Sequence, residues 1–434
     1  MGTVLRILFS CIYNLPLIDR RQAPFFVATF IVELVAVLFL LVALLQAAPA
    51  RAQPVTFYRD VLPILQNRCQ ECHRPAEMAP MSLTTYEGTR PWAKAIREAV
   101  LTRKMPPWFA DPCCGKFAND RSLTPAERDV LVRWADTGAE KGREADAPAP
   151  RKWTEGWNIP KPDAVLQMPR AVDVPATGAV DYQYFVAPTG FTKDQWIQGS
   201  EVLPGDRSVI HHAVVYIREP GDTWTRGPTK ADILTIYAPG SAPDVYPPGM
   251  AKLIKAGADL VVEIHYTPSG KAVRDRTRVG LLFPKTPPTK RVLTLQMDSE
   301  KFVIPAGARD FRVSVWGSLP NDALLLGFFP HMHLRGKAFE YTLIKEDGQP
   351  ETLLKVDPYD FYWQLSYRLA TPRLLPKGTR LVWDAWYDNS ANNRRNPDPS
   401  VEVRYGFQSW EEMMVGFFDV AVDAGVDKTA FFVR

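Results

Sequence analysis

Six histidines carry most of the chemistry that this chain can offer, and each lies in a sequence typical of metal ligands. They stand at positions 73, 211, 212, 265, 331 and 333. One residue separates His331 from His333 in FFPHMHLRG, between apolar LLLGFF and alternating FEYTL. This pattern predicts a β-strand, whose side chains at i and i+2 share a face, so both imidazoles can reach one metal ion. An H-x-H pair alone is more often structural, and the placement of the other histidines is what supports a metal site.

A second group of histidines comes earlier in the chain. His211 and His212 are adjacent in the predicted strand 209–217, and His265 lies in the predicted strand 260–267. Neighbouring side chains of an ideal strand point to opposite faces. His211 and His212 can therefore bind one ion only where the strand is bulged or twisted. Three imidazoles suit zinc as well as copper.

A soft ligand is available near the later pair, because SWEEMMVGFF contains Met413 and Met414. Two imidazoles with one thioether favour Cu(I) over zinc. A zinc hydrolase with a three-histidine site is the weaker interpretation. No Glu or Asp forms a zincin-type motif with these histidines, and Met413 would have no role in it.

The remaining histidine completes Cys69-Gln70-Glu71-Cys72-His73, the C-x-x-C-H motif of covalent haem c attachment. The two thiols form thioethers to the haem, and the histidine ligates the iron. A zinc or redox C-x-x-C is less well supported, since zinc needs a second ligand pair and the histidine is already in register.

The surrounding stretch resembles a small cytochrome c domain, with CHRPAEMAPMSL, MPPW and a closing helix in LTPAERDVLVRWADTGA. The resemblance favours Met105 of MPPW as the distal haem ligand, with Met78 and Met81 as the alternatives that pack on the ring edge. The adjacent Cys113 and Cys114 could form a disulfide, offer thiols to copper, or be two loop residues near the haem.

The amino end has the layout of an export signal. Basic residues precede an apolar run at 25–45, and Ala50-Arg51-Ala52 resembles a cleavage site before Gln53. At this length the run could also remain as a membrane anchor. We therefore expect a periplasmic or secreted protein. Residues 1–52 carry four arginines against Asp19 and Glu33, so their removal lowers the formal charge from +4 to +2, which gives no electrostatic case for nucleic acid.

Beyond the C-x-x-C-H region the chain shows short apolar runs separated by Pro, Gly and Asn, which is typical of antiparallel β-sandwiches. We expect a mainly β fold of antiparallel sandwiches in two halves, preceded by a small helical domain. The charged and then Pro/Ala-rich stretch 139–152 reads as a linker. The predicted boundaries are an export signal or anchor at 1–52, the haem domain at 53–140, a linker and lead-in at 141–180, and two copper domains at 181–287 and 288–434.

The order and spacing of these motifs resemble the copper type II, ascorbate-dependent monooxygenases, the family of the dopamine-hydroxylating and peptidylglycine α-hydroxylating enzymes. The match consists of two adjacent histidines, a lone histidine in VEIHYTPSG, an HMHLRG and a Glu-Met before an apolar strand. APGSAPDVYPPGMA at 238–251 also resembles the family, and the likeness covers roughly residues 180–425.

By this resemblance, His211, His212 and His265 form the electron-storing copper site, and His331, His333 and Met413 form the oxygen-binding copper site. It implies two jelly-roll-like β-sandwiches with one copper each, which face each other across a solvent-filled cleft. It also implies hydroxylation of a carbon–hydrogen bond by O2. Met414 falls where relatives often have cysteine. The expected cofactors are two copper ions and one covalently bound haem c.

Departures from the family bear on the substrate. In the peptide-amidating member an arginine binds the substrate carboxylate, and this chain has Phe329 at that position. That member also has polar residues after the ligand methionine, where this chain has Val415 and Phe417. We therefore expect a small apolar or aromatic substrate. The expected reductant is a periplasmic donor such as a small cytochrome, a quinol-linked carrier or an ascorbate-like molecule. The competing hypothesis is a non-catalytic periplasmic electron-transfer or copper-binding protein.

Overall fold

The computed structural model describes residues 32, 35–37, 53–75, 77–153, 156–178, 180–225, 232–428 and 431. The predicted export signal lies outside them, apart from the four positions before residue 53. None of the helices in the described part of the chain is long and apolar enough to cross a membrane. Residues Val55–Arg434 form one compact unit.

The helices whose bounds are described after residue 53 lie before residue 147. The α-helices are α3 (Leu62–Arg68), α4 (Tyr86–Thr89), α5 (Ala93–Leu101) and α6 (Pro125–Asp136), accompanied by the π-helical η1 (Phe57–Val61) and the 3-10 turns η2 (Arg90–Trp92) and η3 (Glu144–Asp146). Helix α6 begins where the sequence predicts the closing helix. The Thr124 hydroxyl accepts from the Glu127 amide at 3.2 Å, and the Glu127 carboxylate accepts from the Thr124 amide at 2.8 Å. This capping box satisfies two amides that the helix itself cannot pair.

The rest of the described chain is mainly β, as the sequence predicts. Two sheets of the first half have the strand orders β1 (Ala164–Gln167), β12 (Arg278–Leu282), β5 (Gly199–Leu203), β8 (Asp244–Val245), and β3 (Gln183–Pro188), β10 (Asp259–Tyr266), β6 (Ile210–Arg218), β7 (Asp232–Tyr237). A two-stranded ribbon joins β11 (Val273–Asp275) to β2 (Val172–Val174). The buried side chains of these strands form one apolar core.

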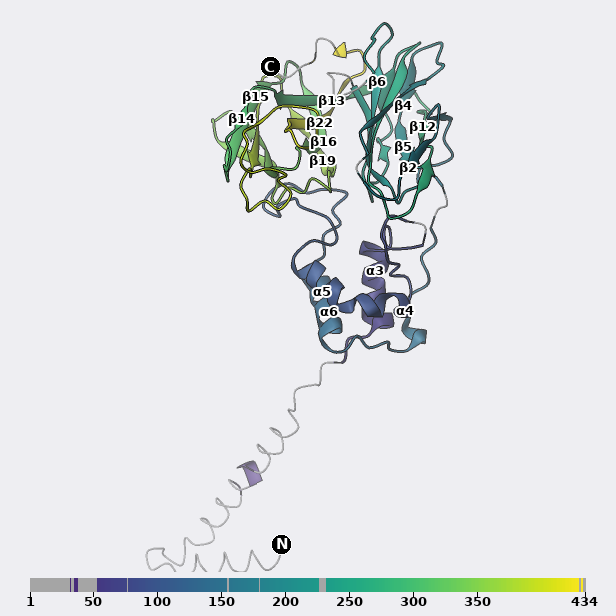
Figure 1. Ribbon diagram of the computed structural model, residues 1–434, viewed down its shortest axis with the longest axis vertical. Helices are drawn as coiled ribbons and strands as arrows, with labels where there is room; N and C mark the ends of the chain where they lie inside the picture. The colour runs from purple at the N-terminus through teal and green to yellow at the C-terminus, as the bar shows by residue number, and fades with distance from the viewer. Residues whose placement is uncertain are drawn as a thin grey trace, which may run out of the picture. The chain divides into compact units, whose positions relative to one another are not determined.

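The second half has a larger core between two further sheets. One sheet runs β15 (Phe311–Ser318), β20 (Arg380–Tyr387), β17 (Gly336–Ile344), β18 (Pro350–Val356), and the other runs β19 (Tyr367–Leu375), β16 (Ala323–His331), β22 (Met414–Asp423), β13 (Lys290–Ser299), β9 (Met250–Ile254), β4 (Gln195–Ile197). A short pair joins β14 (Val303–Ile304) to β21 (Val403–Arg404). Strands β16, β22 and β13 lie side by side in Figure 1, where β22 continues the colour scale toward yellow.

The pairing of β9 with β13 differs from the predicted division at 287/288. Lys290 pairs with Met250 and Arg291 with Ala251 in a parallel register, so a strand from the first half extends a sheet of the second. The Pro-rich segment 283–291 does separate two runs of strands along the chain. Sheet pairing, however, depends on which strand edges meet in space, and that contact is not visible in local sequence.

The stretch 141–180, predicted as linker and lead-in, is more than a connection. It contributes β1 and β2 to the first half, and its beginning packs on the helices. The Tyr58 amide donates to the Lys141 carbonyl at 3.3 Å, and the Arg151 guanidinium donates to the Gln66 carbonyl at 2.7 Å. Charged, Pro-rich composition predicts solvation but does not exclude such backbone contacts.

The two halves also meet through a buried apolar cluster. It joins Val214, Tyr216, Ile233 and Val261 of the first half to Phe329, Met413, Val415 and Phe417 of the second. The solvent-filled cleft implied by the resemblance is therefore closed by packed side chains here. Large aromatic and aliphatic groups at both faces favour this contact, because burial removes their surface from water.

Close packing of the second half generates a stability prediction for Gly416 on β22. A methyl group added there would lie 2.6 Å from Cδ1 of Trp383 and 3.0 Å from Cζ of Phe339, both fully buried. We expect Gly416→Ala to destabilise the fold by about 1–3 kcal/mol, since an overpacked core must shift. The midpoint of urea unfolding, followed by tryptophan fluorescence, should fall accordingly. Gly425→Ala is the matched control, because no atom lies within 4 Å of its added methyl; an equal shift in both variants would contradict the packing argument.

Candidate metal centre

The first histidine group is brought together by an irregularity in the strand pair β6 and β10. His265 pairs with His212, but the next residue of β10, Tyr266, pairs with Ile210, so His211 is the extra residue of a bulge. The bulge turns both neighbouring imidazoles toward His265. The condition derived from the sequence, that the strand must be bulged for His211 and His212 to share an ion, is confirmed.

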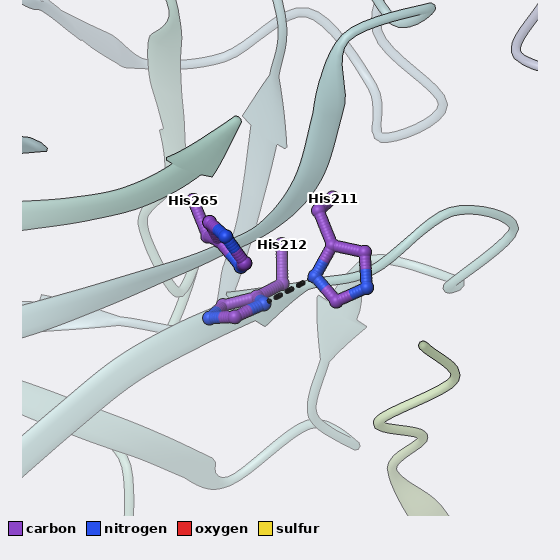
Figure 2. A group of neighbouring side chains, drawn as sticks. All are labelled: His211, His212 and His265. Atoms are coloured by element: carbon purple, nitrogen blue, oxygen red, sulfur yellow. Dashed lines mark hydrogen bonds between the residues drawn. The ribbon is translucent and has the colours of Figure 1, made fainter. Parts of the chain in front are cut away.

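Figure 2 shows the three imidazoles converging from the two strands, with His211 and His212 joined by a hydrogen bond. One potential ligand atom from each residue lies within 4.8 Å of the others. The Nδ1 atoms of His211 and His212 are 2.9 Å apart. Two nitrogen ligands of a tetrahedral ion are separated by about 3.3 Å when metal–nitrogen distances are about 2.0 Å. The cluster could thus hold a metal ion after a small adjustment.

Two nitrogen atoms of this cluster are buried without a hydrogen-bond partner among the described residues, Nε2 of His211 and Nδ1 of His265. Burial also lowers the pKa of His211 to about 3 and that of His265 to about 4. The rings are therefore neutral at ordinary pH, with lone pairs available for a metal. A buried nitrogen without a partner is unfavourable. An ion bound at Nδ1 of His265 would remove that cost there, but not at Nε2 of His211, because that ring faces His212 through its Nδ1.

The second group lies where β16 ends. The strand stops at His331, so His333 stands in the following turn rather than within the strand that the sequence predicts. The side chains nonetheless still alternate between two faces. Met332 enters the core, and the rings of His331 and His333 lie 5.2 Å apart, centroid to centroid. Met413 lines the same pocket as both histidines, whereas Met414 belongs to the core of the second half.

Hydrogen bonds fix the orientation of both rings. Nδ1 of His331 donates to Oε1 of Gln364 at 2.7 Å, and Nδ1 of His333 donates to the Glu411 carbonyl at 3.3 Å. These contacts leave Nε2 of each ring for a metal ion, which is how outer partners commonly hold metal-binding histidines. Burial lowers the pKa of His333 to about 3, so its imidazole is also neutral.

Glu412 secures the turn that carries His333. Its carboxyl group is fully buried and accepts from the amides of His333 at 2.9 Å and Arg335 at 2.6 Å. Burial raises the pKa of Glu412 to about 8. The Glu-Met motif recognised in the sequence thus has two parts, a carboxyl that fixes the turn and a thioether beside the histidines.

One member of the first group and both histidines of the second line a common pocket, which we call the metal pocket. Its wall includes His212 from the first half and His331, His333 and Met413 from the second. The ring of Phe361, 4% exposed, lies 5.7 Å from His211, 6.4 Å from His265 and 6.3 Å from His333 between ring centroids. A single side chain therefore contacts both candidate metal sites.

Sequence reasoning missed the segment that contains Phe361 and Gln364. It is anchored by Tyr359, whose hydroxyl accepts from the Met332 amide at 3.0 Å and donates to the Met332 carbonyl at 2.9 Å. DFYWQ at 360–364 has no metal-site pattern, so no local signal could have found it.

Glu263 was also missed, although it precedes His265 by two residues and thus shares its face of β10. Its buried carboxyl, with a pKa raised to about 7 by burial, lines the metal pocket.

The haem motif occupies the turn after α3. Cys69 and Cys72 are free thiols, and Nδ1 of His73 donates to the Met81 carbonyl at 3.3 Å, which leaves its Nε2 for an iron. These residues fit covalent haem attachment. Met105 is half-buried and follows α5, so its role as distal ligand stays a prediction. Cys113 and Cys114 form a disulfide with each other.

Comparisons with known proteins add little to this description. No family model and no curated protein matches the chain. The structure of infectious bursal disease virus Gx strain aligns with 62% of this chain and 74% of its own at 8% identity and a TM-score of 0.21. The CBM22 tandem domain of Paenibacillus barcinonensis Xyn10C aligns with 62% and 95% at 10% identity and a TM-score of 0.14. Scores this low carry no information about fold or function.

The hydrogen bond from His331 to Gln364 generates a prediction about metal affinity. Gln364→Leu removes the acceptor and leaves the ring free to turn, so any binding of Cu(I) at His331 and His333 should weaken about 10–100-fold. Competition titration with a chelator of Cu(I) measures this. Binding to His211, His212 and His265 should stay unchanged in the same titration and serves as the internal control. Equal weakening of both sites would show a general loss of structure instead.

Proposed function

We propose that this chain is a monooxygenase with two copper ions and one haem c, which hydroxylates a carbon–hydrogen bond of a small apolar or aromatic compound. The observation that supports it most is that His212 of the first histidine group lines the same pocket as His331, His333 and Met413 of the second. A protein that only stored or carried copper would have no need to bring its two sites to one pocket.

The reaction converts R–H, O2, two electrons and two protons into R–OH and water. Copper at the methionine-containing site would supply O2 binding, copper at the three-histidine site would store an electron, and haem c would accept electrons from an outside donor. The thioether of Met413 favours the reduced copper state that binds O2. His211, His212, His265, His331 and His333 act as neutral ligands, and Gln364 and the Glu411 carbonyl hold two of the rings in place.

The walls of the metal pocket determine what can react there. Phe329, Phe417 and Ile233 are apolar, and Phe361 covers the space between the two histidine groups. An anionic substrate group buried against these rings would lack a partner, at a cost of several kcal/mol. This supports a substrate that is apolar where it reacts, and it argues against the glycine-extended peptides used by the peptide-amidating relatives.

We also propose which kinds of domain make up this mainly β protein. Two pairs of facing sheets support two jelly-roll-like copper domains, and the helices around Cys69, Cys72 and His73 support a cytochrome c-like domain before them. We place the protein in the periplasm or outside the cell on the basis of the amino-terminal sequence. A periplasmic reductant is then the expected partner.

Contacts of the haem motif support electron delivery to the three-histidine site. Sγ of Cys72 lies 3.0 Å from the position that a Cβ of Gly240 would occupy, and the Arg121 guanidinium donates to the Gly240 carbonyl. Gly240 follows β7, whose last residue Tyr237 pairs with Ala213 beside His212. A short path thus runs from the attachment cysteine through β7 to a candidate copper ligand.

Labelled oxygen tests the proposal directly. The mature protein, loaded with copper and haem and supplied with a reductant, should incorporate one atom of labelled O2 into a hydroxylated product from a panel of small aromatic and alicyclic compounds. Met413→Ala should lower this activity by more than tenfold, because the thioether ligand is lost. Reductant-dependent copper and haem redox cycling without any labelled product would favour the alternative, a non-catalytic electron-transfer or copper-binding protein.

Gly240 provides a test of the electron route. An added methyl would meet both Arg121 and Cys72, so Gly240→Ala should separate the haem motif from β7. Haem oxidation, followed at its absorbance after fully reduced protein is mixed with O2 and substrate, should slow at least severalfold. Gly221→Ala is the matched control, since it has the same positive φ but no atom within 4 Å. A haem that stays reduced through product formation in the unmodified protein would exclude the route.

A further inference from the structure

The metal pocket is too small to hold a whole organic substrate. Its volume is about 30 Å³, which is room for a water molecule or O2, because one water requires at least about 10–15 Å³ measured this way. A second cavity of about 190 Å³ lies next to it. The two share Ile233, Phe329 and Phe417 as walls. We call this second space the adjacent cavity.

The adjacent cavity is large enough for one six-membered ring. A cavity of about 150 Å³ lined by aliphatic and aromatic side chains can hold benzene. Here much of the wall is apolar, including Leu326, Phe328 and Phe418. A ring compound would therefore gain by leaving water for this space.

The charged groups around the adjacent cavity already have partners. Asp244 accepts from the Thr235 hydroxyl at 2.7 Å and from Arg368 at 3.0 Å. Lys252 donates to the Thr294 hydroxyl at 2.7 Å and also to the Ile233 carbonyl. A ligand with a net charge would have to be buried without a free counter-charge, which is unfavourable.

One polar group of the wall differs from the others. The hydroxyl of Tyr246 is buried and has no hydrogen-bond partner among the described residues, although Tyr246 is only 8% exposed. Of the buried side-chain nitrogen and oxygen atoms that line this cavity, it is the one without a hydrogen-bond partner in the described part of the chain. Buried hydroxyl groups are usually paired, so this one indicates a missing partner.

We infer that the adjacent cavity is the substrate seat of the proposed oxygenase and that Tyr246 sets its specificity, an inference that rests on the proposed function. The ligand is a neutral, single-ring compound with one hydrogen-bonding group, such as a phenol or a cyclic alcohol. That group pairs with the Tyr246 hydroxyl. The opposite end of the ring faces the wall of Phe329 and Phe417, beyond which lies the metal pocket.

Fluorine NMR with two probes tests the inference on the full mature protein without turnover. Para-fluorophenol and fluorobenzene differ by one hydroxyl group. The phenol should bind about threefold to tenfold more tightly, the range expected for one net hydrogen bond. In Tyr246→Phe this preference should disappear while fluorobenzene binds as before. Tyr86→Phe, which removes a hydroxyl bonded to the Ala139 carbonyl elsewhere, should keep the preference.

Location is tested by filling the cavity. Ile236→Trp adds bulk at a half-buried wall position and should abolish binding of both probes, with Leu326→Phe as a second variant if the first fails to fold. Equal binding of the two probes to the unmodified protein, an unchanged preference in Tyr246→Phe, or binding that survives both filling variants would overturn the inference. A third outcome is a preference for the phenol that depends on Tyr246, together with no labelled product from any ring compound. This outcome would overturn the proposed oxygenation but would support the binding site.

Discussion

Burial of neutral imidazoles around one pocket is the constraint on which the rest of the structure depends. Withdrawing a polar nitrogen from water without a new partner costs roughly 1–3 kcal/mol. The fold offsets this cost at His331 and His333 through Gln364 and a backbone carbonyl, but not at Nε2 of His211 or Nδ1 of His265. An apolar surrounding keeps these rings uncharged and a rigid sheet keeps them together. Such a site is unfavourable when empty and well suited to a metal ion.

The positions of the rings follow from three separate devices. A bulge in β6 turns His211 and His212 to one side, the end of β16 releases His333 into a turn, and the Glu412 carboxyl holds that turn by accepting two amides. Phe361, carried by a segment anchored at Tyr359, then fills the space between the two groups. Each device uses few residues, yet together they join strands from both halves of the chain into one pocket.

The helical region is tied to both halves. On one side, Gly240 permits close approach of Cys72. On the other, Trp108 lies 4.9 Å from Tyr367 between ring centroids, and the Asp111 amide donates to the Lys355 carbonyl at 2.8 Å. Under the proposed function these contacts would keep the electron donor at a fixed distance. A flexible tether would provide only a high local concentration.

The sequence by itself determined the parts of this protein that depend on local pattern. Alternating apolar residues predicted the strands that carry His211, His212 and His265, and LTPAERDVLVRWADTGA predicted the helix that became α6, because such signals need only neighbours along the chain. The need for a bulge followed from two adjacent histidines and strand geometry alone. The C-x-x-C-H and H-x-H motifs likewise identified candidate ligands before any contact was known.

Only the tertiary structure decided what depends on residues far apart in the chain. It brought Phe361 close to both histidine groups, joined β9 to β13 across the predicted boundary, and placed Tyr246 in the wall of the adjacent cavity. None of these has a local signature, since DFYWQ or a single tyrosine can serve in any loop. Packing between distant strands selects them, and packing is a property of the whole fold.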